Sequence, residues 1–123
     1  MSNAAVWFEI YVQDMPRARK FYETVLQKKL SELKSPASEL EMWAFESDLK
    51  SYGTGGALVK MAGVGSGGSG TIVYFSCQDC AVEEARVKPA GGKVHKSKMS
   101  IGQHGYISLL VDTEGNMFGL HSM

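Results

Sequence analysis

Two cysteines with a spacing known from reactive sites, Cys77 and Cys80, are the first candidates for chemistry in this sequence. A Cys-x-x-Cys pair can form a redox dithiol, contribute half of a zinc site, or simply pack. A structural zinc normally needs four ligands, and the sequence has neither a second cysteine pair nor histidines at zinc-finger spacing. Cys77 ends an apolar run, and Cys80 falls in the first turn of a predicted helix. We therefore interpret both as small buried side chains.

Glu9 is the second candidate, because it interrupts an apolar segment, residues 6–12, that alternates as a β-strand does. The even-numbered residues of this segment are all apolar, whereas Glu9 shares the odd-numbered face with Trp7 and Tyr11. A carboxylate is costly to bury without a partner or a purpose. Glu9 is therefore either a charged anchor or general base of a ligand site, or one half of a structural ion pair.

The three histidines differ in their surroundings. His121 lies in the last predicted strand, where it is either a partner and proton carrier for Glu9 or a solvated residue near the terminus. His104 lies in a glycine-bounded turn, and His95 lies in the lysine-rich segment 93–98, which has the pattern of a solvated edge strand. We interpret His95 and His104 as surface residues.

Length, composition and charge restrict the class of protein. A chain of 123 residues corresponds to about one domain, and 44% hydrophobic residues exclude intrinsic disorder. Thirteen basic residues balance thirteen acidic ones, whereas nucleic-acid-binding proteins usually carry a basic excess. No segment approaches the roughly 18–20 apolar residues of a membrane span, and the start of the chain lacks a signal-peptide layout. We expect a cytoplasmic protein with neither nucleic acid nor a membrane as its partner.

The first half of the chain predicts a strand, a helix and three further strands. Asp14 stands in the N-cap position after the first strand, and apolar residues then recur at helical spacing up to about Gln27. Because Trp43 and Phe45 alternate with the neighbouring apolar residues, we expect a partner subunit or a ligand to cover one face of their strand. The predicted elements are a strand at 6–12, a helix at 14–27, and strands at 30–33, 39–46 and 57–61.

The second half repeats this order when Asp14 is aligned with Asp79. Its predicted elements are a strand at 71–77, a helix at 79–89, and strands at 94–99, 105–111 and 117–121. Residues 63–70, with five glycines and two serines, predict a flexible connector between module 1 (about 5–62) and module 2 (about 71–123). Neither half would bury its sheet alone. We therefore predict a single α+β domain of tandem βαβββ modules, a curved half-barrel sheet with the helices outside.

This tandem pattern, with the segments 8–22 and 112–120, resembles the vicinal oxygen chelate superfamily of glyoxalase I, bleomycin-resistance proteins and extradiol dioxygenases. The specific motifs are Arg-Ala-x-x-Phe-Tyr on the first helix and Asp-x-x-Gly-Asn before the last strand. We expect both motifs to serve the fold, with Phe21 and Tyr22 anchoring the helix and Gly115-Asn116 forming a tight turn. The resemblance also implies a homodimer.

Enzymes of this superfamily commonly hold a divalent metal through His, Gln or Glu side chains of the first, fourth, fifth and eighth strands. By position, those places fall on Trp7, Ala57, Ile72 and Gly119. None of these side chains offers a metal ligand, so we predict no metal cofactor at the usual site. A divalent metal held by other residues, if this alignment is shifted, stays the alternative.

The sequence favours a glyoxalase- or bleomycin-resistance-like protein that binds a small molecule without the superfamily's metal. The expected pocket is lined by Trp7, Glu9, Tyr74 and His121, with a small apolar or planar ligand stacked on the aromatic residues. The alternatives are a lyase, isomerase or dioxygenase of the same superfamily, either metal-dependent or using Glu9 as general base, and an interaction module with a vestigial cavity. The fold does not choose among them.

Overall fold

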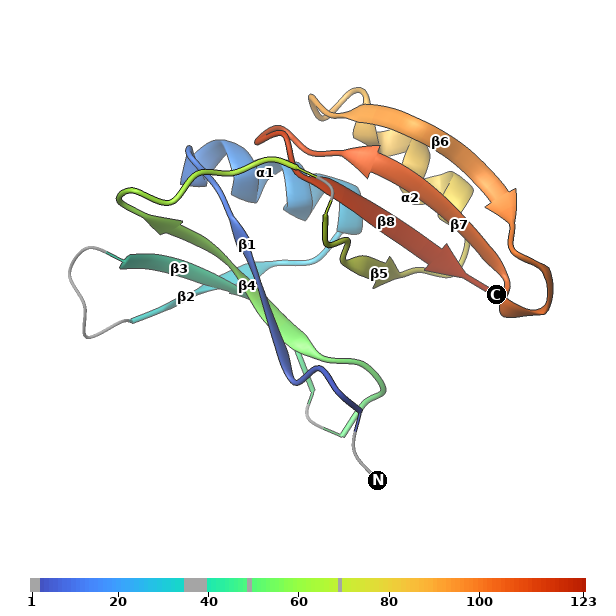
Figure 1. The fold of residues 1–123 in the computed structure, drawn as a ribbon, viewed down its shortest axis with the longest axis horizontal. Helices are drawn as coiled ribbons and strands as arrows, with labels where there is room; N and C mark the ends of the chain where they lie inside the picture. The colour runs from blue at the N-terminus through green and yellow to red at the C-terminus, as the bar shows by residue number, and fades with distance from the viewer. Residues whose placement is uncertain (1–2, 35–39, 49, 69) are drawn as a thin grey trace.

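The computed structural model describes residues 3–34, 40–48, 50–68 and 70–123, and it confirms two copies of the order βαβββ (Figure 1). The first copy consists of β1 (Trp7–Tyr11), α1 (Met15–Leu26), β2 (Leu30–Leu33), β3 (Leu40–Phe45) and β4 (Gly55–Met61). The second consists of β5 (Tyr74–Ser76), α2 (Cys80–Val87), β6 (Lys93–Ser100), β7 (Tyr106–Val111) and β8 (Met117–Ser122), with a short 3-10 helix, Gly102–His104, before β7. The segment between β2 and β3, residues 35–39, which includes the first residue of the strand predicted at 39–46, lies outside the described residues.

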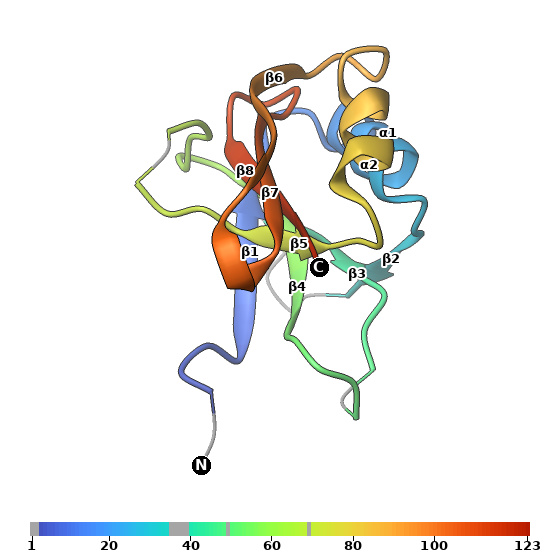
Figure 2. The same cartoon turned by 90° about the vertical axis from the view of Figure 1, so that its right-hand side faces the viewer.

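Each copy folds into its own four-stranded mixed sheet. The strand orders are β1-β4-β3-β2 and β5-β8-β7-β6, and in each sheet the first pair is parallel and the others are antiparallel. The two helices pack together on one side of the sheets, where Arg86 Nη1 donates a hydrogen bond to the carbonyl of Val25 (Figure 2). The fold class is therefore the predicted one, α+β with open, curved sheets. Neither helix is long and apolar enough to span a membrane, as far as the chain is described.

The two helices begin at the predicted caps. Asp14 accepts a hydrogen bond from Arg17 N at 3.0 Å, and Asp79 accepts one from Ala81 N at 3.0 Å. The first helix ends as predicted, at Gln27 in the left-handed conformation. The second is shorter than predicted, because Pro89 has no backbone N–H to continue the helical hydrogen bonds.

The first strand of the second module is also shorter than its prediction, 71–77. The chain reaches β8 only at Val73, whose carbonyl accepts a hydrogen bond from Gly119 N. The connector, residues 63–70, was expected to be flexible. Within it, Ser66 Oγ donates to the carbonyl of Glu114 at 2.8 Å, and Gly67 N donates to Asn116 Oδ1 at 2.6 Å. The connector is thus tied to the turn between β7 and β8, because that turn supplies polar acceptors to a segment poor in side chains.

One aromatic core joins the two modules. Phe21 and Tyr22 of α1 are each 1% exposed, and the ring of Tyr22 packs on Phe118 of β8 and Phe75 of β5 with centroids 5.4 and 5.8 Å apart. Phe21 contacts Phe118 as well. The predicted anchoring of the first helix is confirmed, and the helix packs on both sheets because its apolar stripe faces the seam between them.

Trp43 and Phe45 lie on the face of β3 that is turned toward α1. The guanidinium of Arg19 lies 3.5 Å from the centre of the Trp43 ring, and the Phe45 ring packs on Tyr22. Helix α1 therefore covers this face of β3. The opposite face, with Met42 and Ala44, is the one the helices leave open.

Candidate functional site

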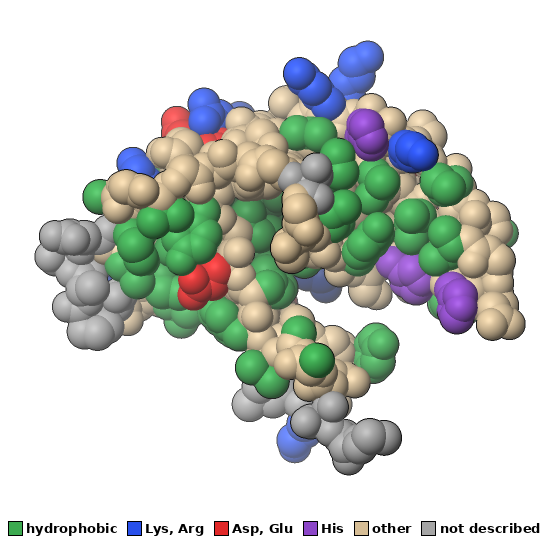
Figure 3. All heavy atoms as spheres, in the orientation of Figure 1, with side chains coloured by type: hydrophobic (Ala, Val, Ile, Leu, Met, Phe, Trp, Pro, Cys, Tyr) green, Lys and Arg blue, Asp and Glu red, His purple; other side chains and the backbone are tan. Residues whose placement is uncertain are grey.

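The open faces of the two sheets carry the residues that we expected to form a site. Glu9 lies beside Ala57 of β4 on the face turned away from α1, whereas Ile10 packs in the core with the helix. The face assignment made from the alternation of β1 is therefore confirmed. In the space-filling view, hydrophobic side chains cover much of both sheets on the side facing the viewer, and the molecule is hollowed between the modules (Figure 3).

Glu9 is exposed, and two aromatic neighbours on its own strand hold its carboxylate. Trp7 Nε1 donates to Oε2 at 3.3 Å, and the Tyr11 hydroxyl donates to Oε1 at 2.9 Å. The hydrogen bond to Glu9, together with partial burial, raises the pKa of the Tyr11 phenol. No Lys, Arg or His within the described ranges forms an ion pair with Glu9. The two hydrogen bonds therefore orient the carboxylate of Glu9, and no basic side chain within the described ranges pairs with its charge.

Tyr74 lies on the inner edge of the second sheet, with 46% of its surface exposed. It pairs with Gly119 of β8, and a Cβ added at Gly119 would lie only 2.3 Å from the Tyr74 ring. The ring therefore lies against Gly119, and it occupies the space that a side chain at this position would need. The rings of Phe8 on β1 and Phe75 on β5, on the buried faces of these edge strands, are 5.9 Å apart.

His121 occupies β8 beside Ser76 of β5, and its ring is engaged by the backbone. Nε2 lies 2.7 Å from the carbonyl oxygen of His104, which places a protonated Nε2 as the donor. No hydrogen bond joins His121 to Glu9, whose recorded bonds go to Trp7 and Tyr11. The structure thus places the four predicted pocket residues on the open faces without linking the acid to the imidazole.

A cavity of about 650 Å³ lies on the other side of β1. Its walls include Phe8, Phe45 and Phe75, and none of the four predicted pocket residues lines it. Alternation along β1 explains this: Phe8 points to the buried side and Glu9 to the open side. The molecule therefore presents two separate surfaces to a ligand, the open sheet faces and this cavity between the modules.

The model of the Glyoxalase/Bleomycin resistance protein/Dioxygenase superfamily matches residues 4–120. The chain belongs to this superfamily. Similar solved structures include glyoxalase I from Zea mays (TM-score 0.73, 22% identity, 94% of this chain and 44% of that chain). A superfamily member from Sphaerobacter thermophilus has a TM-score of 0.74 at 17% identity, covering 99% and 98% of the two chains. The fosfomycin resistance protein FosX from Listeria monocytogenes has a TM-score of 0.66 at 14% identity, covering 100% and 92%.

These likenesses establish the superfamily fold. The chain spans less than half the length of the maize enzyme, and no curated protein matches it in sequence.

The residues of this superfamily member do not fit the metal centre that the resemblance implies. The four positions hold an indole, a methyl group, an aliphatic chain and a hydrogen atom, none of which binds a divalent cation, and the aliphatic residue lies just before β5. They are Trp7, Ala57, Ile72 and Gly119. Within residues 3–34, 40–48, 50–68 and 70–123, no three His, Cys, Asp or Glu side chains are grouped so that they could hold a metal ion.

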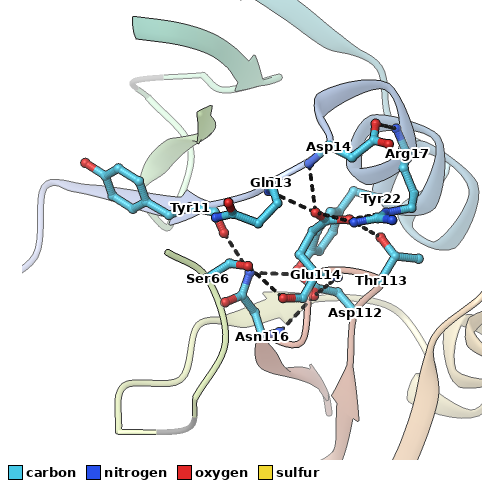
Figure 4. Close-up of polar contacts among 10 residues, drawn as sticks. All are labelled: Tyr11, Gln13, Asp14, Arg17, Tyr22, Ser66, Asp112, Thr113, Glu114 and Asn116. Carbon is cyan, nitrogen blue, oxygen red and sulfur yellow. Dashed lines mark hydrogen bonds and ion pairs between the residues drawn. The ribbon is translucent and has the colours of Figure 1, made fainter. Parts of the chain in front are cut away.

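The polar cluster that sequence reasoning missed is centred on Glu114, in the turn between β7 and β8 (Figure 4). Its side chain is fully buried and pairs with Arg17 of α1 at 2.7 Å. It also accepts hydrogen bonds from the backbone N–H groups of Gln13 and Asp14 and from the Thr113 hydroxyl. Burial opposes ionisation, but the hydrogen bonds from Arg17 and the backbone outweigh it and lower the pKa of Glu114 to about 2.

Asp112 continues this cluster on the core side. The Tyr22 hydroxyl donates to its carboxylate at 2.6 Å, and the backbone N–H groups of Glu114 and Asn116 donate to its other oxygen. Burial raises the pKa of Asp112, and these hydrogen bonds offset it only in part. The residues of this cluster lie within the two sequence motifs. Their pairing depends on the tertiary fold, because Arg17 and Glu114, and likewise Tyr22 and Asp112, are about ninety residues apart. The cluster holds the modules together.

Of the two cysteines, both of which the sequence suggested to be buried, only Cys80 is buried, and Cys77 is half-buried. Cys77 Sγ donates to the carbonyl of His121 at 3.4 Å. Burial, followed by the nearby Cys80, raises the pKa of the Cys77 thiol to about 12. The reactive thiolate is therefore scarce at neutral pH.

Proposed function

We propose that this superfamily member binds a small organic molecule on its open sheet faces, with Glu9 as the polar anchor and no metal centre. Trp7 and Tyr74 supply the aromatic contacts, and both are more than 40% exposed, so a planar ligand can stack on them. The single observation that carries the proposal is the exposed Glu9 carboxylate, which is oriented by two donors and has no ion-pair partner among the described residues.

The chemistry of Glu9 favours a ligand with N–H donors. Each carboxylate oxygen accepts one hydrogen bond from an aromatic side chain, and lone pairs remain on both. An apolar ligand body over Trp7 and Tyr74 displaces water and strengthens a bond to the carboxylate. A planar cation such as an amidinium would bind both oxygens at once.

We further propose a cytoplasmic homodimer that has neither nucleic acid nor a membrane as its partner. The zero net charge supports the absence of a nucleic-acid partner, and the open apolar sheet faces support self-association. In a dimer, the second copy has the same four strand residues and adds no ligand at the usual metal positions.

The test uses benzamidine, a planar cation, and NMR shift mapping on the full chain. Benzamidine should shift the resonances of Trp7, Glu9 and Tyr74 in a saturable way, and Glu9→Gln should weaken its binding about tenfold, the usual scale for a charge-assisted bond. Glu41→Gln is the matched control, because Glu41 also accepts from an indole two residues away, Trp43 Nε1 at 3.1 Å, but on the helix side.

Elemental analysis of the purified protein completes this test. We expect no stoichiometric transition metal. One tightly bound metal per chain, removable by a chelator with loss of stability, would overturn the proposal in favour of a metal-dependent lyase, isomerase or dioxygenase. Equal benzamidine affinity in the Glu9 and Glu41 variants would remove Glu9 from the site.

A further inference from the structure

The cavity of about 650 Å³ is built by both modules. Its walls come from the residues before β1, the loop between β3 and β4, and elements β5 and α2. In Figures 1 and 2, the segment before β1 and that loop lie together at the end of the first module away from the helices. The volume is in the range of about 300–1,000 Å³ that holds a drug-sized ligand.

Three phenylalanines form the apolar wall of this cavity. The rings of Phe8, Phe45 and Phe75 pack on one another with centroids 5.4–5.9 Å apart, and all three are only half-buried. The backbone at Gly56 supports the Phe8 ring by close contact, because a Cβ added at Gly56 would lie only 2.4 Å from that ring. The protein thus leaves a rigid aromatic surface uncovered at the seam between the modules.

The charged side chains around this wall are mainly acidic. Glu46, Asp48 and Glu83 line the cavity, whereas Lys28 is the one basic lining residue among those described. Three carboxylates and one ammonium group give the lining a net negative charge at neutral pH. Such a charge favours a cationic ligand.

The carboxylates differ in the hydrogen bonds that they already accept from the protein. Asp48 accepts hydrogen bonds from Lys50 N and from Ser51 Oγ within its own loop. Glu83 is different, because its Oε1 atom is shielded from water and has no hydrogen-bond partner among the described residues. A buried carboxylate oxygen without a donor is costly and calls for a partner.

We propose that this cavity binds an organic ammonium ion with an aromatic or branched apolar body. The ammonium group donates a hydrogen bond to Glu83, and the apolar body packs against the wall of Phe8, Phe45 and Phe75. The aromatic faces also attract the positive charge directly. This site is separate from the open face proposed above, because Phe8 and Glu9 point to opposite sides of β1.

The probe is 2-phenylethylammonium, titrated into the uniformly ¹⁵N-labelled full chain. Saturable shifts are expected at lining residues, with Ser51 and Gly53 of the loop between β3 and β4 as reporters. The uncharged 2-phenylethanol, which has the same ring, should bind about tenfold more weakly, and 3-phenylpropanoate should not bind. This ligand series tests the charge requirement in the unmodified protein.

Glu83→Gln should weaken binding of 2-phenylethylammonium about tenfold without lowering the melting temperature, since it removes a poorly partnered charge at constant size. The matched control is Glu84→Gln, one residue along α2 and outside the cavity lining, where the side chain accepts from Lys98 N instead. Glu9→Gln should leave the probe-induced shifts at Ser51 and Gly53 unchanged, so failure of this site and failure of the open-face site give different results.

Three results would overturn the proposal. Equal affinity of the ammonium and the alcohol, or of the Glu83 and Glu84 variants, would show that charge plays no part. Shifts confined to residues of the open face would place the probe at the other site. Shifts at Ser51 and Gly53 that depend on protein concentration without any probe would show that a second copy of the chain fills the cavity.

Discussion

Glu114, in the turn between β7 and β8, accepts hydrogen bonds from five donors, whereas Glu9, on the open face of β1, accepts them from two. The side chain of Glu114 is fully buried and paired with Arg17, and that of Glu9 is exposed. Both are oriented carboxylates in the same superfamily fold. The difference is whether donors of the protein itself use all of the hydrogen-bonding capacity of the carboxylate.

This comparison separates a structural acid from one available to a ligand. Four of the five hydrogen bonds to Glu114 come from the other module, so the carboxylate stabilises the contact between modules and has no capacity left. The donors around Glu9 come from its own strand, so they fix its direction and contribute little to the tertiary fold. A carboxylate of the second kind is the one we expect to act in binding.

The largest effect should follow from Glu114→Ala. The change leaves the half-exposed Arg17 side chain and two partly buried backbone N–H groups without their acceptor, and we expect a loss of about 2–4 kcal/mol in the free energy of unfolding. Chemical denaturation measures it. Glu9→Ala should change the free energy of unfolding by no more than about 0.5 kcal/mol. An equally small loss for Glu114→Ala would contradict the distinction between a structural carboxylate and one available to a ligand.

Acid should destabilise the protein through Glu114. Its pKa falls from 4.5 in the unfolded chain to about 2 in the fold, so the unfolded state takes up the proton first as the pH falls. The stabilisation is complete above pH 4.5 and is lost toward pH 2, for a total of about 2–3 kcal/mol.

The measurement is urea unfolding of the native protein and of Glu114→Gln between pH 7 and pH 2. The difference in stability between the two should shrink as the pH falls. Asp112 acts in the opposite direction, because its raised pKa favours the protonated form in the fold. It is present in both proteins, so a constant difference across the range would contradict the role given to Glu114.

Asp14→Ala should have a smaller effect, because it removes only the cap of α1. We expect a loss of about 0.5–2 kcal/mol in unfolding free energy, while Asp14→Asn, which keeps a capping oxygen, should be close to neutral. Asp79→Ala should also destabilise, since Asp79 both caps α2 and pairs with Lys98 at 2.8 Å. Equal midpoints for Asp14→Ala and Asp14→Asn in denaturant would show that the cap does not stabilise the helix.

The smallest effect is expected for Glu9→Gln, which should leave the unfolding midpoint almost unchanged. Its signature is local: the pKa of the Tyr11 phenol should fall toward its usual value, because the negative acceptor that raises it is gone. Ultraviolet titration of the phenols measures this, with Glu41→Gln as the control. An unchanged Tyr11 titration would mean that the bond between Tyr11 and Glu9 is absent in solution.

The fold was largely predictable, and the site only in part. Alternation along residues 6–12 correctly separated Phe8 from Glu9, because period-2 geometry is local to one strand. The capping residues Asp14 and Asp79 were found for the same reason. The hydrogen bonds to Glu9 also join neighbours two residues apart, and the signal for them was an indole and a phenol flanking an acid on one face.

The sequence by itself determined what depends on neighbouring residues: the strands and helices, their repeat, the faces of β1, and the absence of metal ligands at four positions. Only the tertiary structure decided that Arg17 meets Glu114, since those residues are separated by 97 positions. It alone brought Phe8, Phe45 and Phe75 to one cavity wall and left Glu83 Oε1 without a donor in the part of the chain that the structure describes. Such contacts depend on how two sheets and two helices pack, and periodicity within one element carries no information on that packing.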